Sequence, residues 1–345
     1  MKLEEQIAEL SSQIGLSGSE KPIANYLEKK LKSLSIQTEI DRFGNVHGRM
    51  PAAVQPAKTL LLEAHMDQIG LMISGIDDGG YLKFVNLGGV DERILCGMEV
   101  KILSAPPCYG VIGAYTPNLE DDEKKKRRNA KLEELRIDAG LSAEAARENI
   151  RVGSGVVMQA ECTKLMDGKL SGMAMDNRAG VAAILECIAN LQEEILPYNL
   201  EILFSTQEEL GLHGAYTGII PGMADAAIAV DVTHGTTPDS KEETGVFPLG
   251  SGAVICRGPN LHYDYTKQLI SLARGQGVSH EIEVASGGSG TTAWAIQMIG
   301  TGIPVMLVSI PLRYMHTNVE TLAVRDVQAV VQLLTAAAKG GVRLA

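Results

Sequence analysis

The sequence has little of three things: aromatic side chains, cysteine and positive charge. Only 4% of its 345 residues are aromatic, with a single tryptophan, so aliphatic side chains must build the hydrophobic core. The five cysteines are odd in number and form no C-x-x-C pair, which argues against a disulfide framework or a thiolate zinc site. The formal net charge is −11, and an acidic surface repels nucleic acid and anionic lipid.

Long hydrophobic runs are also missing, because no apolar stretch reaches the length of a membrane span. The opening segment, MKLEEQIAELSSQIG, reads as an acidic amphipathic helix without the basic and apolar regions of a signal peptide. Together with the sparse cysteine, these absences predict a cytoplasmic protein with neither a membrane nor a nucleic acid as partner.

The order of the predicted elements indicates an α/β fold. Apolar strand-like runs alternate with helical patterns, and this alternation predicts a mostly parallel sheet covered by helices on both faces. The strand-like runs cover residues 59–64, 200–206, 224–230 and 304–310. The helical patterns include a stretch near residues 265–275 and a terminal one over 324–339.

A different sequence pattern interrupts this alternation of strands and helices in the first half of the chain. Short strand-like runs alternate with glycine turns over residues 70–167, which predicts an inserted small β-barrel domain. The catalytic domain is then made of residues 1–69 and 168–345. Within the insert, the mixed charges of residues 120–128 predict a solvated loop, and a helical stretch is expected over about 130–149.

Acidic and imidazole side chains follow the predicted strands. In open α/β sheets, sites form beyond the carboxyl ends of the strands, so these side chains should gather at one rim. They are His65, Asp67, Glu208, Glu209, Asp231 and His316, with Asp176 just before a predicted helix. Carboxylate and imidazole ligands without thiolate suit zinc, and also cobalt or manganese.

The charges favour two metal ions over one. Three ligand carboxylates leave one positive charge against two divalent ions, and a bridging hydroxide would neutralise it. A single ion would leave an anionic cluster that has to take up a proton or repel itself. Two-metal sites hydrolyse amides and phosphates, so the residues predict a hydrolase.

Spacing suggests further roles. Asp67 lies two residues after His65 on the same strand face, where it can accept the second imidazole N–H and fix the tautomer. The adjacent Glu208 and Glu209 are expected to point apart. One of them can then bind metal while the other faces the attacking water as general base.

Several motifs together carry a family resemblance. HMDQIG, GMAMDNRAG, STQEELGLHGA, VDVTHG and SIPLRYMHTNVE, with the DRFGNV hairpin and the β-rich insert, follow one another in order over nearly the whole chain. The set resembles the tetrahedral (TET) and glutamyl aminopeptidase family, whose members have also been labelled cellulase M or endoglucanase M. The resemblance implies an α/β metallopeptidase domain whose inserted β-barrel mediates dimerisation, and a homo-oligomer in which dimers can assemble into a tetrahedral dodecamer.

The resemblance also implies an activity and residue roles. A dinuclear metal-dependent aminopeptidase would hydrolyse the N-terminal peptide bond of short peptides through a metal-bound hydroxide, using two divalent ions per subunit, zinc foremost. Glu208 would be the general base and Asp67 would orient His65. One ion would be held by His65, Asp176 and Asp231, and the other by Asp176, Glu209 and His316, with Asp176 bridging.

The sequence departs from the family pattern at three positions. Gln68 stands where Glu is usual, and Asn177 and Thr292 stand where Asp is usual, so negative charge is removed. Thr292 lies in a glycine-rich region that we expect to border the substrate pocket. His213 and His234 are expected not to be ligands, although His234 follows Asp231 closely enough to contact substrate.

Three alternative functions compete with the aminopeptidase. The same centre could remove acyl groups from N-acyl amino acids or peptides, since it can serve any amide. Glycoside hydrolysis by paired carboxylates is disfavoured, because few aromatic side chains are available as platforms for sugar rings. A non-catalytic assembly protein would use the same fold without the chemistry, and the intact ligand and base positions argue against it.

Overall fold

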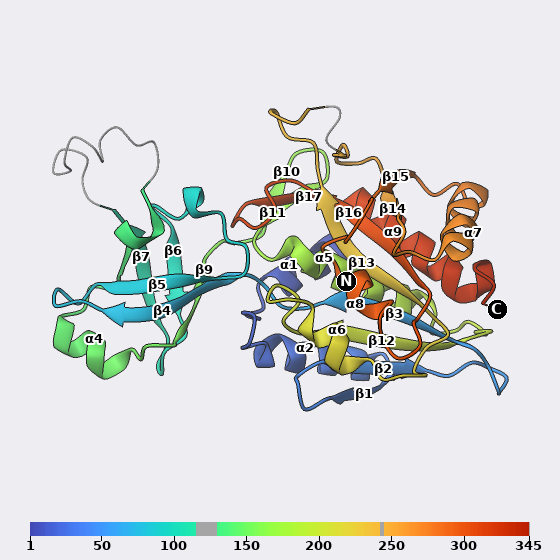
Figure 1. Cartoon of the computed structure of the whole chain (residues 1–345), viewed down its shortest axis with the longest axis horizontal. Coiled ribbons are helices and arrows are strands. Elements are labelled where there is room, and N and C mark those ends of the chain that lie inside the picture. Colours follow the sequence, from blue (N-terminus) through green and yellow to red (C-terminus); the bar gives the residue numbers. More distant parts are fainter. Residues whose placement is uncertain (115–129, 242–244, 345) are drawn as a thin grey trace.

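The computed structural model describes residues 1–114, 130–241 and 245–344, which form a large α/β body and a smaller β-barrel beside it (Figure 1). The chain opens with helices α1 (Leu3–Ser11) and α2 (Lys21–Ser33). Each buries one apolar stripe, with Ile7 and Leu10 on α1 and Ile23 and Leu27 on α2, in one shared hydrophobic core. Among the described residues, no helix has the length and apolar character that a bilayer crossing requires.

The main sheet has eight strands in the order β1-β2-β12-β3-β13-β16-β14-β15. Its central strands β12, β3, β13 and β16 run parallel, while the β1–β2 hairpin and the β14–β16 pair are antiparallel. The strands are β1 (Gln37–Ile40), β2 (Val46–Met50), β3 (Thr59–His65), β12 (Asn199–Ser205), β13 (Ala226–His234), β14 (Ala253–Arg257), β15 (His280–Val284) and β16 (Val305–Leu312). The predicted mostly parallel sheet is therefore confirmed.

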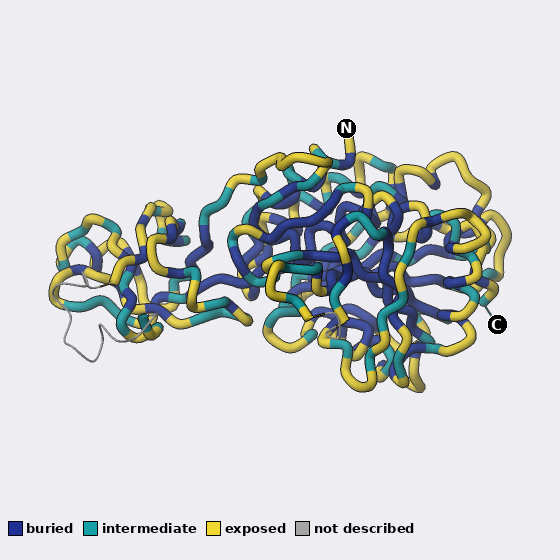
Figure 2. The backbone as a smooth tube through the Cα atoms, turned by 90° about the horizontal axis from the view of Figure 1, so that it is seen from above, coloured by how far each residue is buried: buried dark blue, intermediate teal, exposed yellow. Residues whose placement is uncertain are grey.

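Both faces of this sheet are covered, because its strands alternate apolar side chains between two cores. Leu60 and Leu62 of β3 pack into the core under α5 (Met175–Asn190), α7 (Tyr263–Gly275) and α9 (Val324–Ala336). Leu61 joins the opposite core under the short helices α6 (His213–Gly218) and α8 (Thr292–Ile296). Figure 2 shows the buried chain concentrated in the interior of the larger body, with exposed chain around it. Burial on both faces explains why the central strands are nearly continuous hydrophobic runs.

The insert is a closed antiparallel barrel with strand order β4-β5-β8-β7-β6-β9. Leu71, Phe84 and Ile102 belong to its own hydrophobic core, so it packs as a separate unit. Its strands are β4 (Gly70–Ile76), β5 (Leu82–Leu87), β6 (Glu99–Ile102), β7 (Cys108–Gly113), β8 (Arg136–Asp138) and β9 (Gly155–Met158). The predicted inserted small barrel is confirmed.

One expectation inside the barrel is wrong. The stretch expected to be helical over about 130–149 contains the single turn η3 (Leu132–Glu134), strand β8 and only then helix α4 (Ala143–Asn149). Ile137 is buried and pairs with Leu82 and Ile112, so barrel closure between β5 and β7 overrides the local helical pattern. The charged run over 120–128 lies outside the described residues.

A small three-stranded sheet joins the barrel to the α/β body. It contains β10 (Thr163–Leu165), β11 (Lys169–Gly172) and β17 (Glu320–Ala323), in that order. Strand β11 leads directly into α5, and β17 leads into α9, so this sheet fixes where both helices begin. A short 3₁₀ helix, η1 (Glu92–Ile94), lies in the barrel, and a π-helical segment, η5 (Ala337–Gly341), follows α9.

Candidate metal centre

The carboxyl ends of β3, β12, β13 and β16 meet at one edge of the main sheet, and the predicted rim residues gather there. His65 ends β3, Asp231 lies near the end of β13, and Asp176 lies at the start of α5. Six predicted residues line one cavity of about 600 Å³, namely His65, Asp176, Glu208, Glu209, Asp231 and His316. Asp67 is wholly buried behind them.

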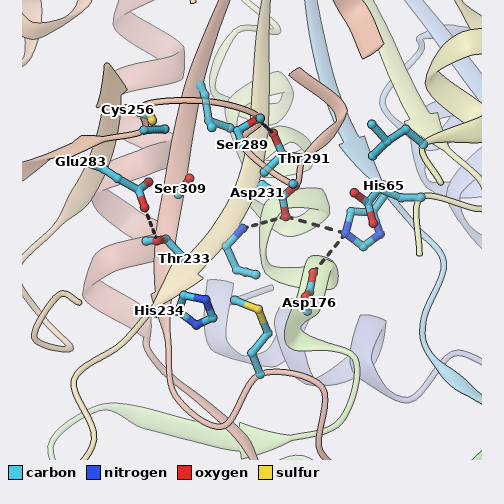
Figure 3. A pocket seen from close by; sticks show the side chains of 18 of the residues that line it. His65, Asp176, Asp231, Thr233, His234, Cys256, Glu283, Ser289, Thr291 and Ser309 are labelled. Carbon is cyan, nitrogen blue, oxygen red and sulfur yellow. Dashed lines mark hydrogen bonds and ion pairs between the residues drawn. The ribbon is translucent and has the colours of Figure 1, made fainter. Parts of the chain in front are cut away.

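Asp176 lies between two groups of potential ligands. Its Oδ1 is 3.0 Å from His65 Nε2, and its Oδ2 is 3.4 Å from His316 Nε2. His65, Asp176 and Asp231 offer ligand atoms within 4.8 Å of one another, and so do Asp176, Glu209 and His316. Figure 3 shows the first of these groups converging on His65. Each oxygen of the Asp176 carboxylate thus faces a different imidazole.

Glu208 and Glu209 do not point apart, contrary to the expectation from their adjacency. Their carboxylates and His65 form a third group with ligand atoms within 4.8 Å of one another. The alternation of side chains ends with β12 at Ser205, and Gln207 takes a left-handed conformation with φ of 49°. The two glutamates therefore sit in a turn, where strand geometry no longer separates neighbouring side chains.

Asp67 anchors this turn. Its Oδ1 accepts the backbone N–H of Glu208 at 3.0 Å, and its Oδ2 accepts that of Glu209 at 3.2 Å. The Ser17 hydroxyl donates to the same carboxylate at 2.7 Å. Asp67 Oδ1 also lies 3.4 Å from His65 Nδ1, but that nitrogen makes no hydrogen bond among the described residues. Asp67 thus positions the glutamate pair as well as facing His65.

The barrel contributes to the site through the loop after β5. His316 Nδ1 donates a hydrogen bond to the Gly89 carbonyl at 2.9 Å, so in the neutral imidazole the other nitrogen, Nε2, carries no proton and is directed toward Asp176 and Glu209. A carbonyl can only accept, so this contact sets the tautomer that a metal ligand needs. The sequence offered no signal for Gly89, because the contact joins two domains.

Glu320 is a buried carboxylate at the end of the SIPLRYMHTNVE motif, and no role was predicted for it. Its Oε1 accepts the backbone N–H of His316 at 2.9 Å, and its Oε2 accepts that of Asp176 at 3.2 Å. One side chain on β17 therefore holds two candidate ligands that are far apart in the sequence. Its place four residues after His316 was the available signal.

Glu63 was missed because it lies within an apolar run. It is buried on β3 two residues before His65, and Ser205 donates a hydrogen bond to it at 2.6 Å. The Thr292 hydroxyl donates to the other oxygen of the same carboxylate. The glycine-rich region before Thr292 lines the cavity through Ser289, Gly290 and Thr291, as expected, whereas Thr292 itself is buried beside it. Burial raises the pKa of Glu63 to about 7.

The other two departures from the family pattern have structural partners. Asn177 donates from Nδ2 to the Val230 carbonyl at 2.7 Å and accepts the Gly180 N–H, and Gln68 accepts the Gly15 N–H. Both are buried outside the cavity lining. Neither His213 nor His234 belongs to a ligand group among the described residues, but His234 lines the cavity.

The crowded, buried carboxylates of the rim favour the binding of cations. Burial, reinforced by neighbouring carboxylates and opposed by His65, raises the pKa of Glu208 to about 9, and burial likewise raises the pKa of Glu209. The two histidines outweigh burial at Asp176 and hold its pKa below the usual value. Crowded buried carboxylates either take up protons or bind cations. Oxygen and imidazole donors in this number fit divalent ions such as zinc.

Fold and site together define a class: an α/β protein with an inserted barrel and a buried carboxylate–imidazole centre suited to divalent ions. Such centres are typical of metal-dependent hydrolases. The chain belongs to the M42 glutamyl aminopeptidase family, because the family's sequence profile matches residues 44–333. Membership confirms the resemblance found in the motifs and makes the chain a peptidase.

Individual relatives agree with this assignment. A putative aminopeptidase of Acetivibrio thermocellus is 32% identical over 94% of both chains. The solved aminopeptidase APDkam598 of the archaeon Desulfurococcus kamchatkensis is 32% identical with a TM-score of 0.90, covering 98% of this chain and 94% of that one. The TET1 peptidase of Pyrococcus horikoshii, which can assemble into a tetrahedron or a large octahedral shell, is 30% identical with a TM-score of 0.85, covering 98% and 99%.

Proposed function

We propose that the protein is a dinuclear metal-dependent aminopeptidase that removes the N-terminal residue of short peptides. The observation that carries this proposal is the Asp176 carboxylate, whose two oxygens face His65 and His316 at 3.0 and 3.4 Å. His65, Asp176 and Asp231 would hold one ion. Asp176, Glu209 and His316 would hold the other, so Asp176 would be shared between the two.

Bound divalent ions, zinc foremost and cobalt or manganese as alternatives, would supply Lewis acidity to the peptide carbonyl and lower the pKa of the attacking water. Glu208 lines the cavity and stands outside both Asp176 groups, so its carboxylate is free to act as general base. It would take a proton from the attacking water and give it to the leaving amine. Asp67 would keep Glu208 in place through its backbone N–H.

The substitution Glu208→Gln tests this assignment, because it preserves shape and removes the proton acceptor. We expect kcat on an amino-acid anilide to fall by about 10²–10⁴-fold while the bound metal content is unchanged. The exposed Glu193→Gln is the matched control and should retain activity. Full activity of the metal-loaded Glu208→Gln protein would contradict the assignment.

A substrate panel separates the proposal from its alternatives. Amino-acid anilides should be cleaved in a manner that chelator abolishes and added zinc, cobalt or manganese restores. Cleavage confined to N-acyl amino acids would identify a deacylase instead, and chelator-resistant glucan hydrolysis would identify a glycosidase. Protein that is purified with metal but cleaves none of these would point to an assembly role.

We further propose a homo-oligomer whose dimer contact lies on the inserted domain of residues 70–167. Val85, Tyr109 and Val111 expose apolar side chains on β5 and β7, with exposed fractions of 45%, 53% and 43%. The assemblies formed by the Pyrococcus horikoshii relative support this proposal. Light scattering should show a multimer for the natural protein and a smaller species for Val111→Lys. Location in the cytoplasm stays a prediction.

A further inference from the structure

The cavity extends beyond the metal rim to an acidic side chain that the proposed chemistry does not use. Glu283 lies on the edge strand β15 and lines the cavity together with Thr233 and Cys256. Figure 3 shows Glu283 and Thr233 on one side of the cavity and the group of Asp231, His65 and Asp176 on the other. Glu283 is therefore placed to contact a bound molecule rather than a metal at the rim.

The partners of Glu283 are neutral. The Thr233 hydroxyl donates a hydrogen bond to its carboxylate at 2.9 Å, and the Cys256 thiol interacts with the same group. Among the described residues that line the cavity there is no lysine and no arginine. The basic side chain of His234 acts to lower the pKa of Glu283, and the carboxylate of Asp231 acts to raise it. Within the described lining, Glu283 thus lacks a fixed cation.

The charges on the rest of the cavity leave the Glu283 carboxylate without a balancing positive charge. Two divalent ions would balance the four rim carboxylates, which are Asp176, Glu208, Glu209 and Asp231. Glu283 would then keep an uncompensated charge in a partly enclosed space. Burial raises its pKa, which means that ionisation costs free energy in the empty cavity. A positively charged group of a bound molecule would recover that cost.

The spacing along β13 between the metal rim and Glu283 fits the side chain of the N-terminal residue of a bound peptide. Thr233 follows Asp231 by two positions on β13, so both face the same side, roughly 7 Å apart along the strand. A peptide with its first carbonyl at the rim would direct its first side chain along this strand toward Glu283. Lysine carries its ammonium on a flexible four-carbon stem, and arginine carries a fork that matches a carboxylate.

We propose that Glu283 is a specificity-determining residue that selects peptides whose first side chain is cationic, lysine or arginine. This inference rests on the proposed aminopeptidase function. The contact is a charge-assisted hydrogen bond in a partly enclosed cavity. Such a bond corresponds to a preference of at least about tenfold over an uncharged side chain of the same length.

The test compares lysine with norleucine, which has the same four-carbon side chain without the ammonium. Metal-loaded natural protein, Glu283→Gln and the exposed same-strand control Glu281→Gln are assayed with lysyl and norleucyl p-nitroanilides. Calorimetry measures binding of lysinamide and norleucinamide to the same proteins. We expect the natural protein and Glu281→Gln to favour lysine at least about tenfold in kcat/KM and in affinity, and Glu283→Gln to lose that ratio.

The outcomes separate this inference from the function on which it rests. A natural protein that binds both amides equally, or a Glu283→Gln protein that keeps the lysine preference, would overturn the role of Glu283. If Glu283→Gln weakened the binding of both amides equally, the proposed role of Glu283 would also be overturned. The carboxylate would then hold the α-amine that both amides share. Lysinamide preference without cleavage of any anilide would support Glu283 and refute the aminopeptidase.

Discussion

Glu320 shows at the scale of a single residue how the candidate centre is held together. Its two oxygens accept the backbone N–H groups of Asp176 and His316, which lie on different elements. A carboxylate can serve both donors at once, while an amide offers one oxygen. The side chain is a positioning residue, since it acts on the metal centre through two other residues.

This arrangement predicts the effect of Glu320→Gln. One backbone N–H should lose its partner, and we expect affinity for divalent ions to fall by about 10–100-fold, as for other supports of metal ligands. Competition titration with a chelator measures this affinity, with the exposed Glu193→Gln as control. Unchanged metal affinity in a folded Glu320→Gln protein would show that the carboxylate serves the fold alone.

At the scale of elements, the β1–β2 hairpin depends on Asp41. Its Oδ1 accepts the backbone N–H groups of Phe43, Gly44 and Asn45, and His47 contacts its other oxygen at 3.2 Å. Burial raises the pKa of Asp41, but the hydrogen bonds from Asn45 and His47 outweigh it and lower the pKa below the usual value. The ionised carboxylate therefore stabilises the hairpin, and with it one edge of the main sheet.

The sign of this shift predicts a pH dependence. A lowered folded-state pKa contributes stability above the unfolded value of about 4, and this contribution is lost as the pH falls through the folded value. We expect Asp41→Asn to reduce the free energy of unfolding by about 1 kcal/mol at pH 7, a modest figure because the carboxylate is partly exposed. Urea unfolding at pH 7 and near pH 3 measures it, and a difference that persists undiminished in acid would contradict the expectation.

The barrel loop after β5 is a second element whose contribution can be isolated. A Cβ atom at Gly89 would meet His316 Nδ1 at 2.7 Å, so Gly89→Ala must displace the imidazole or the loop. Gly113 in β7 has open space at the same position and provides the matched control. Gly89→Ala should lower the metal content from two ions per chain toward one, and Gly113→Ala should not. Equal metal content in both variants would refute a role for the barrel in the second metal position.

At the scale of the whole molecule, metal removal should lower stability as well as activity. The four rim carboxylates come from segments throughout the α/β body, and without cations their mutual repulsion opposes its closure. A ligand at 100 times its Kd adds about 2.7 kcal/mol to the folded state. We therefore expect calorimetry to show a Tm several degrees lower in chelator and restored by zinc, cobalt or manganese. Asp176→Asn should reduce the rise in Tm that added metal produces. A Tm that does not change with metal would argue against a metal centre in this protein.

Local patterns predicted much of this molecule because they reflect local physics. The apolar runs that became β3 and β13 end at His65 and Asp231 because strands buried on both faces are hydrophobic until they reach the rim. Strand β8 was mistaken for helix because its three residues carry no periodicity that outweighs their neighbours. The convergence of Glu208 and Glu209 was mispredicted because alternation applies within strands and fails in the turn that follows.

The sequence by itself determined the α/β class, the inserted barrel, the family and the set of residues that reach the rim. Tertiary structure alone decided that Asp176 faces two histidines, that Gly89 and Glu320 hold His316, and that Glu283 lies in the same cavity. The physical reason is the separation along the chain of the residues that make each contact. Burial patterns and motifs depend on residues that are close together in the sequence, whereas contacts between distant segments depend on strand order, sheet register and loop conformation.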